Sequence, residues 1–538
     1  MPKTICKIIL CAMAALLVTI PPLHAAAAPS SLYVVKSDHW SEADEQGYRD
    51  FIRAIGESNC DSLDACLHSA ANPFRDSDPP EHRFLSDCAE LPYVLRFYYA
   101  WKKGLPFSYA AAVAPRDGSG GDIRYTHQGN TVAARRDVPG GVLSGYAVID
   151  RIREAVSSAT YRLHPDTDGP LPPDFYSPAV TPAAIRAGTV IYDPAGHVAI
   201  VFRVDPDGRV HAFDAHTDYS LTQMMFDVRF ARMKPALGAG FKNWRPLRLV
   251  GAVTMPDGSL RGGHVEPAKN AEIADFSTEQ YYGTGQRPAD ADWAGGGFAV
   301  NGEKLDFYDF VRARLAGGKL LFDPVKEVRE TAWSICSDLH YRAQAVELAR
   351  GLAAEPHPAR LPRNIYGTEG DWEFYSTPSR DARLKTVFKA LRDTVQRFVE
   401  MQKRGDPHLD YAGSDLPGDL LQAYSRPAAY CRITYRKSDG SLTTFSMEDA
   451  RRRLFALSFD PYDCPERRWG ASGDELASCP ADAGKAAWYA AEQALRSQID
   501  RNYDARMDFS LRQLQGEPAS APPDTDVIGY LKSVLAKN

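Results

Sequence analysis

The sequence predicts an α+β protein in two parts: an N-terminal domain with a helix packed on an antiparallel sheet, and a mainly α-helical C-terminal domain with one β-hairpin. Two observations predict this division. Helix-like and strand-like segments alternate up to residue 249, whereas apolar residues recur every three or four positions after residue 303. A stretch rich in glycine and small residues lies between them. We therefore expect domains over 28–250 and 303–538, joined by a linker over 251–302.

In the second half, the apolar spacing predicts several helices and the alternation near residue 440 predicts a hairpin. The turn of that hairpin is expected at Asp439–Gly440. These segments would form an ancillary domain without a catalytic constellation of its own. The expected segments are helices over 305–315, 326–354, 379–403, 447–458 and 483–513, and the hairpin over 430–447.

The N-terminus has the composition of a secretory signal peptide. Lys3 and Lys7 precede an apolar run from Ile8 to Ile20, and the small residues Ala25–Ala28 follow. We expect a signal peptide over 1–27 and a secreted or periplasmic location. No later window approaches the ~20 apolar residues that a spanning helix needs, so we expect no integral membrane span.

Composition narrows the possible partners. The chain has 538 residues, 44% of them hydrophobic and 25% charged, with a net charge of −6. It shows neither a basic stripe nor a nucleic-acid motif, so no nucleic-acid partner is expected. The spacing of His, Cys and acidic residues predicts no metal site and nothing indicates a cofactor. The sequence leaves the oligomeric state undetermined.

The cysteine count points to one free thiol. Nine cysteines are present and two lie within the predicted signal peptide, which leaves seven. In an oxidising compartment six can pair while one stays free for chemistry. Six cysteines allow several connectivities, so the pairing stays open. Short spacing favours Cys60 with Cys66 and Cys464 with Cys479, which leaves Cys336 and Cys431 as a long-range pair.

Cys88 is the candidate nucleophile. Ser86 or Asp87 would cap a helix directly before it, and apolar residues then follow on one face. A thiol at a helix N-terminus has a lowered pKa, because the helix dipole and unpaired N–H groups stabilise the thiolate. Pro92 lies where a regular helix would be strained, so the helix is expected to begin irregularly.

His197 is the candidate base, because it opens the second of three predicted strands. These strands cover 189–192, 197–204 and 209–215, with a tight turn at 205–208. Antiparallel pairing across the turn would bring Asp214 and His216 beside His197, where either could orient its ring. We favour Asp214. Asp214 and His216 are two positions apart and so point to the same side of a strand, which means that the alternation of side chains does not choose between them.

These residues resemble the motifs of the NlpC-type, papain-like cysteine peptidases and amidases. The matching positions cover about 130 residues and are Asp87-Cys88, Ala187-Gly188-Thr189-Val190, Gly196-His197-Val198-Ala199-Ile200, and Asp214 or His216. The resemblance implies a papain-like fold, amide hydrolysis through a thioester, and commonly a peptidoglycan stem peptide as substrate.

The chain also departs from that family pattern. Ala89-Glu90 stands where Ser-Gly is usual, and the 109 residues from Cys88 to His197 imply an inserted segment over 116–178. An Asp as orienter and the segment Lys103–Pro106 are similar to the transglutaminase-like branch, which implies acyl transfer. A non-catalytic secreted binding protein that retains the fold is the third possibility. His82 is a further candidate, as an oxyanion-binding side chain.

Overall fold

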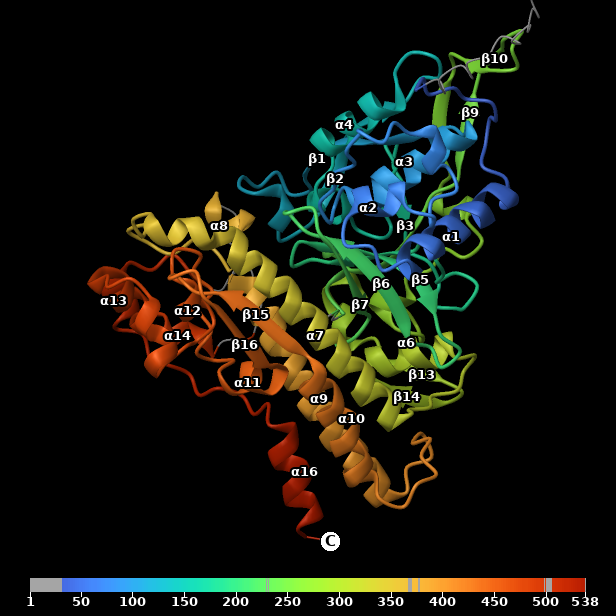
Figure 1. Ribbon diagram of the computed structural model, residues 1–538. Helices are drawn as coiled ribbons and strands as arrows, with labels where there is room; N and C mark the ends of the chain where they lie inside the picture. Colours follow the sequence, from blue (N-terminus) through green and yellow to red (C-terminus); the bar gives the residue numbers. More distant parts are fainter. Residues whose placement is uncertain are drawn as a thin grey trace, which may run out of the picture.

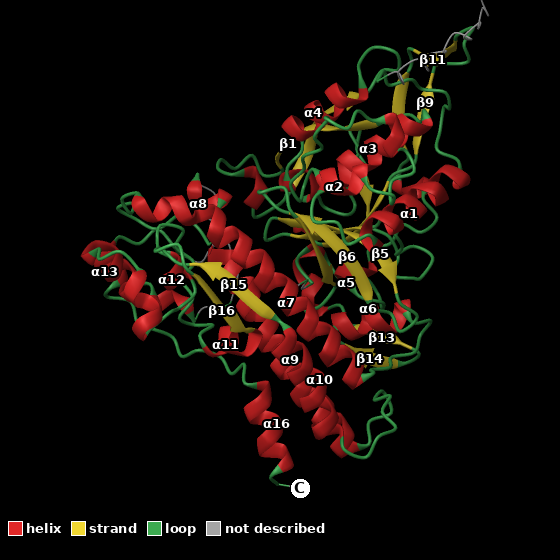
Figure 2. Cartoon of the chain, viewed as in Figure 1, coloured by secondary structure: helices red, strands yellow, loops and turns green. Residues whose placement is uncertain are grey.

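The computed structural model describes residues 31–228, 230, 232–365, 370–375, 378–497, 499 and 506–537. The predicted signal peptide lies outside the described residues. A central antiparallel sheet lies between helices of the first half on one face and helices of the second half on the other (Figures 1 and 2). The predicted α+β class is confirmed.

The central sheet contains six strands in the order β3-β8-β4-β5-β6-β7, all paired antiparallel. The three strands predicted around His197 form its middle, and their observed bounds differ from the predicted ones by at most one residue. The strands are β3 (Phe175–Tyr176), β4 (Val190–Asp193), β5 (His197–Val204), β6 (Val210–Ala215), β7 (Leu221–Met225) and β8 (Gly240–Trp244).

Helices of the first half cover one face of this sheet. Helix α3 (Leu91–Lys103) is almost wholly buried, and α1 (Glu42–Glu57) packs against β5 and α3. Alternate strand residues such as Val198, Ile200 and Phe213 enter the same apolar core as these helices. The face that contains Val198 is therefore closed by the first half of the chain.

The opposite face is covered by the second half. Ile191, Val201 and Phe241 share one continuous core with α6 (Phe307–Leu315), α7 (Pro324–Leu348), α9 (Pro378–Arg404) and α10 (Leu416–Tyr430). Helix α7 lies next to β7, at the edge of the sheet (Figure 1). Both halves thus bury the same sheet, one on each face.

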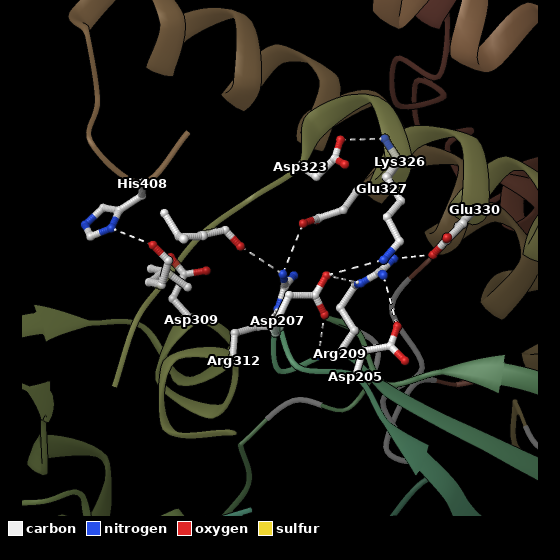
Figure 3. Close-up of polar contacts among 12 residues, drawn as sticks. Asp205, Asp207, Arg209, Asp309, Arg312, Asp323, Lys326, Glu327, Glu330 and His408 are labelled. Carbon is white, nitrogen blue, oxygen red and sulfur yellow. Dashed lines mark hydrogen bonds and ion pairs between the residues drawn. The ribbon is translucent and has the colours of Figure 1, made fainter. Parts of the chain in front are cut away.

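Charged residues join the turn between β5 and β6 to α6 and α7 (Figure 3). Arg209 pairs with Asp205 and Asp207 of the turn and with Glu330 of α7. Arg312 of α6 donates to the carbonyl of Asp207 at 3.1 Å and pairs with a carboxylate of α7. This network fixes the end of the hairpin remote from His197.

The helices of the second half follow most of the predicted ranges, with two differences. The range 447–458 holds only α11 (Met447–Arg452), followed by turns. The range 483–513 is not one helix but α13 (Ala483–Ala491), α14 (Gln493–Arg496) and α15 (Leu511–Leu514). Apolar residues of this range, among them Trp488, Met507 and Phe509, pack in a separate apolar cluster. The three- and four-residue spacing of apolar residues therefore reflects packed loops here as well as helix faces. The predicted hairpin is confirmed as β15 (Arg432–Arg436) and β16 (Leu442–Ser446).

Smaller elements complete the described chain. The segment between α3 and β4 contains a hairpin and a helix, and the region after β8 forms short hairpins. The elements are α2 (Leu63–His68), β1 (Ser108–Pro115), β2 (Asn130–Asp137), α4 (Gly145–Ala155), β9 (Leu247–Val250), β10 (Val253–Thr254), β11 (Leu260–Arg261), β12 (His264–Pro267), α5 (Glu279–Tyr282), β13 (Phe298–Val300), β14 (Glu303–Leu305), α8 (Asp371–Phe374), α12 (Pro465–Arg468) and α16 (Val527–Leu535).

Three disulfides form, and they are the three pairs that the spacing favoured. Cys60 is bonded to Cys66, Cys336 to Cys431, and Cys464 to Cys479. Cys88 is the one free thiol among the described cysteines. Three disulfides fit an oxidising compartment such as the periplasm or the extracellular space. Over the described residues, no helix has the length and apolar character to cross a membrane.

Candidate functional site

The candidate site is a pocket at the start of β5, between the sheet and helices α7 and α9. All four predicted side chains line this pocket: Cys88, His197, Asp214 and His216. The opposite wall belongs to the second half of the chain, whose residues no sequence motif had indicated. That wall includes Asp338, Tyr341, Arg342, Glu373, Arg380, Asp381 and Arg383.

Cys88 lies in a turn before α3 rather than in the helix itself. The side chain of Asp87 accepts hydrogen bonds from the N–H groups of Ala89 and Glu90, both at 2.9 Å. Glu90 accepts in return from the N–H of Asp87 at 3.0 Å, so the turn is closed in both directions. The regular helix begins at Leu91, and Pro92 falls in its first turn, where proline is tolerated. The predicted cap is therefore wrong: Glu90, and not Ser86 or Asp87, directly precedes the helix, because the residues around Cys88 form a separate turn.

The sulfur of Cys88 lies against the first residues of β5. Its thiol donates to the carbonyl oxygen of Gly196 at 3.7 Å. Pairing between β5 and β6 begins only at Ile200 and Phe213, so the start of β5 is paired with β4 alone. Gly196 has φ +88°, and a Cβ there would lie 2.7 Å from the hydroxyl of Tyr125. Glycine is thus required at position 196, whose carbonyl oxygen accepts the hydrogen bond from the Cys88 thiol.

The predicted lowering of the Cys88 pKa is wrong for this arrangement. Burial raises the pKa of the Cys88 thiol, and the adjacent carboxylate of Asp87 raises it further. The helix tip cannot compensate, because the first helical residue comes three positions later. In this state the thiol is protonated.

Asp214 holds the ring of His197. The Nε2 atom of His197 is hydrogen bonded to Oδ2 of Asp214, while Oδ1 of Asp214 accepts from the hydroxyl of Thr222 at 2.6 Å. With its Nε2 bound to a carboxylate, the neutral imidazole keeps its lone pair on Nδ1, where a base would accept a proton. Thr222 of β7 was not found from the sequence, because nothing in its local pattern differs from that of an ordinary strand threonine.

The charges around this pair keep it in one protonation state. Burial lowers the pKa of His197, and the positive charge of Arg383 lowers it further. The pKa of Asp214 lies well below its usual range; burial opposes this, but the nearby imidazoles His216 and His197 outweigh it. At neutral pH the site therefore contains a neutral imidazole anchored by a carboxylate.

His216 occupies a different position from Asp214. Its Nε2 lies 2.9 Å from the hydroxyl of Thr222, and its ring stacks on Tyr341 of α7 with centroids 3.9 Å apart. The rings of His197 and His216 are 6.0 Å apart. Asp214, and not His216, is hydrogen bonded to the His197 ring.

Cys88 and His197 line one pocket without a direct hydrogen bond between the sulfur and the ring in the described structure. The sulfur instead contacts the residue that immediately precedes His197. A rotation of the thiol away from Gly196 would be needed before it could give its proton to the imidazole. The geometry thus brings the two groups to the same strand start but leaves them unpaired.

Side chains from α9 complete the pocket. Arg380 donates to the hydroxyl of Thr217 at 2.7 Å and reaches the carbonyl of Glu373. Arg342 of α7 makes a two-pronged pair with Asp381 at 2.9 and 3.0 Å. The wall opposite Cys88 therefore contains both guanidinium groups and carboxylates.

His82, the candidate oxyanion-binding side chain, lies elsewhere. Its ring packs against Phe84 and Tyr146, with centroids 4.6 and 4.0 Å away, and it does not line the pocket. The expectation was wrong because nearness in sequence to Cys88 does not bring His82 to the sulfur. The intervening residues turn it toward Phe84 and toward Tyr146 of α4.

Comparisons with protein-family models, curated proteins and solved structures gave no match to this chain.

Proposed function

We propose that this chain is a secreted cysteine hydrolase with a papain-like, NlpC-type domain that cleaves amide bonds. One observation carries the proposal: the one free thiol of the described cysteines shares a pocket with an imidazole anchored by a carboxylate. A nucleophile, a base and an orienting acid are the three groups that thioester chemistry requires.

In the proposed reaction, Cys88 passes its proton to Nδ1 of His197 as the sulfur attacks the substrate carbonyl carbon. Backbone N–H groups of the turn, including that of Cys88, would stabilise the oxyanion. The imidazolium then gives its proton to the amide nitrogen, the C–N bond breaks and the amine leaves. Water, deprotonated by His197, hydrolyses the thioester and restores the thiol.

The resemblance to NlpC-type enzymes suggests peptidoglycan stem peptides as the substrate. The guanidinium groups of Arg380 and Arg383 on the pocket wall support a substrate with carboxylates, which stem peptides contain. The decisive experiment is digestion of purified peptidoglycan with mass analysis of the released fragments. New amino termini are expected with the wild-type chain and not with Cys88→Ala.

Matched variants separate the site from general stability. His197→Ala should abolish turnover, and Asp214→Asn should lower kcat by roughly 10²-fold or more with a smaller effect on KM. His211→Gln is the control, because His211 lies on the same strand as Asp214 but pairs with Asp205 at the far end. Equal losses in all three variants would contradict the assigned roles.

Acyl transfer is distinguished from hydrolysis by adding a labelled primary amine. Covalent incorporation of the amine into an acyl donor, in place of net hydrolysis, would identify the transglutaminase-like reaction. Both reactions depend on Cys88, so this outcome changes the acceptor and not the nucleophile.

Two observations favour a non-catalytic binding protein as the second candidate. The raised pKa of Cys88 and its hydrogen bond to Gly196 describe a resting thiol. If peptidoglycan fragments bind equally to the wild type and to Cys88→Ala, and no fragment is cleaved, this candidate replaces the hydrolase.

A further inference from the structure

A second cluster of ionisable side chains lies in the C-terminal half, outside the Cys88 pocket. His357 follows α7, Asp460 precedes α12, and Glu492 lies between α13 and α14. One ligand atom from each of the three residues lies within 4.8 Å of the other two. Asp460 and Glu492 are only 1% and 0% exposed, so solvent cannot satisfy their charges.

The hydrogen bonding of His357 leaves one ring nitrogen directed at this cluster. Its Nδ1 lies 2.6 Å from the carbonyl of Pro358, which can only accept, so Nδ1 carries a proton. The ring is also stacked on Trp488, with centroids 4.3 Å apart. Nε2 faces Asp460 Oδ2 at 2.8 Å, without the alignment of a hydrogen bond. Burial opposes it, but Asp460 raises the pKa of His357, so an ion bound here would displace the Nε2 proton.

The two carboxylates also have unused acceptor atoms. Oδ1 of Asp460 accepts from the N–H of Tyr462 at 2.8 Å, but Oδ2 has no hydrogen-bond donor within the described chain. Neither oxygen of Glu492 has a donor there either. Buried carboxylate oxygens without donors are costly, and natural proteins satisfy them with donors or with a cation.

The nearest cation fills this role only in part. Arg496 lies 3.5 Å from Glu492, but it donates to the carbonyl of Tyr489 and its guanidinium lies over the Tyr489 ring at 3.8 Å. Its hydrogen bonding is therefore directed away from the cluster. Two further groups of possible ligands in the described residues contain cysteines that are already disulfide-bonded, so only this cluster offers free donors throughout.

We propose that His357, Asp460 and Glu492 bind one divalent transition-metal ion of the Zn²⁺ or Mn²⁺ class. One imidazole nitrogen with carboxylate oxygens suits these ions, whereas Ca²⁺ prefers oxygen ligands alone. Two carboxylates balance the charge of the ion. The Nδ1 bond to Pro358 is the support that metal-binding histidines usually have.

The proposed ion has a structural role. Its ligands come from three separate segments, and Asp460 and Glu492 are buried. Cross-linking these segments would hold the region of α12 to α14 in place, and Arg468 and Arg342 connect that region to the wall of the Cys88 pocket. This inference does not depend on the proposed hydrolase activity.

The test uses the full mature chain, stripped with a chelator and dialysed. Zn²⁺ or Mn²⁺ is added back, bound metal is measured by elemental mass spectrometry, and Tm by calorimetry. We expect one ion per chain and a Tm rise of several degrees, because an ion bound only to the folded state stabilises it.

Variants locate the site. Asp460→Asn and Glu492→Gln should each abolish the bound ion and the metal-dependent rise in Tm. Asp371→Asn is the matched control, since Asp371 accepts from Tyr462 in the same apolar cluster without belonging to the donor set. Should the stripped wild type bind neither ion at millimolar concentration and keep its Tm, Nε2 of His357 is protonated and simply pairs with Asp460, and the proposal is overturned.

Discussion

At the scale of single residues, Cys88 shows how the surroundings of a thiol control its reactivity. Asp87 closes the turn around Cys88 and also places a negative charge beside the sulfur. The same residue therefore shapes the site and keeps the thiol protonated. Substrate binding or a rotation of the thiol toward His197 would have to relieve this state before attack.

We predict slow alkylation of Cys88 by iodoacetamide at neutral pH, with a rate that rises steeply at higher pH. Asp87→Asn keeps the capping oxygen but removes the charge, so it should lower the pKa of Cys88 and speed labelling roughly tenfold per pKa unit. Asp76→Asn is the control, because Asp76 is exposed. Rapid labelling of the wild type at pH 6, unchanged in Asp87→Asn, would refute the prediction.

Stability should depend on pH through His216. Burial lowers the pKa of His216 to about 4, whereas an imidazole in the unfolded chain titrates near 6.5. As the pH falls below 6.5, the unfolded chain takes up a proton that the folded chain refuses, so stability is lost. The titration of His216 alone should lower the free energy of unfolding by about 2 kcal/mol between pH 7 and pH 5.

Urea unfolding at the two pH values measures this loss. His216→Phe retains a ring to stack on Tyr341 but cannot titrate, so its stability should change less between pH 7 and pH 5. Each protein is compared with itself at the two pH values, so any general effect of the substitution on the free energy of unfolding cancels. An identical loss in the variant and the wild type would show that His216 is not responsible.

At the scale of elements, the Cys336–Cys431 disulfide ties α7 to the end of α10 across 95 residues. Replacing both cysteines by alanine should lower the free energy of unfolding by about 2–4 kcal/mol, because the unfolded chain regains the freedom of a long loop. The Cys60–Cys66 pair, with a separation of six residues, is the comparison and should cost less. Chemical denaturation of both double variants tests this order.

At the scale of the whole molecule, the central sheet depends on both halves of the chain. The face with Ile191, Val201 and Phe241 is buried largely by helices of the second half, with a smaller contribution from residues such as Phe226 and Phe298. The same helices supply Tyr341, Arg380 and Arg383 to the pocket. Fold and site therefore share one requirement, which is that the C-terminal helices stay docked.

A fragment over 28–250 should consequently fail to fold into a stable monomer. It would expose a whole apolar sheet face, and patches of that size promote association. Size-exclusion chromatography and dye binding to exposed apolar surface, with the full mature chain as reference, test this expectation. A monomeric fragment with cooperative unfolding would show that the first half is an independent domain.

The sequence by itself determined the local features of this protein. Alternation and turn residues located β4, β5 and β6 to within one residue, because strand periodicity and a tight turn are encoded locally. The odd cysteine count singled out one thiol, and the short spacing favoured the pairs that form. His197 and Asp214 were found together because the predicted hairpin brings the start of β5 close to the end of β6.

Only the tertiary structure decided the rest. The start of α3, the burial beside Asp87 and the packing of α9 set the state of the Cys88 thiol, and none of these follows from a motif. His357, Asp460 and Glu492 are far apart in the chain, so their spacing indicated no metal site. Desolvation and charge depend on which distant segments meet, and that is a property of packing.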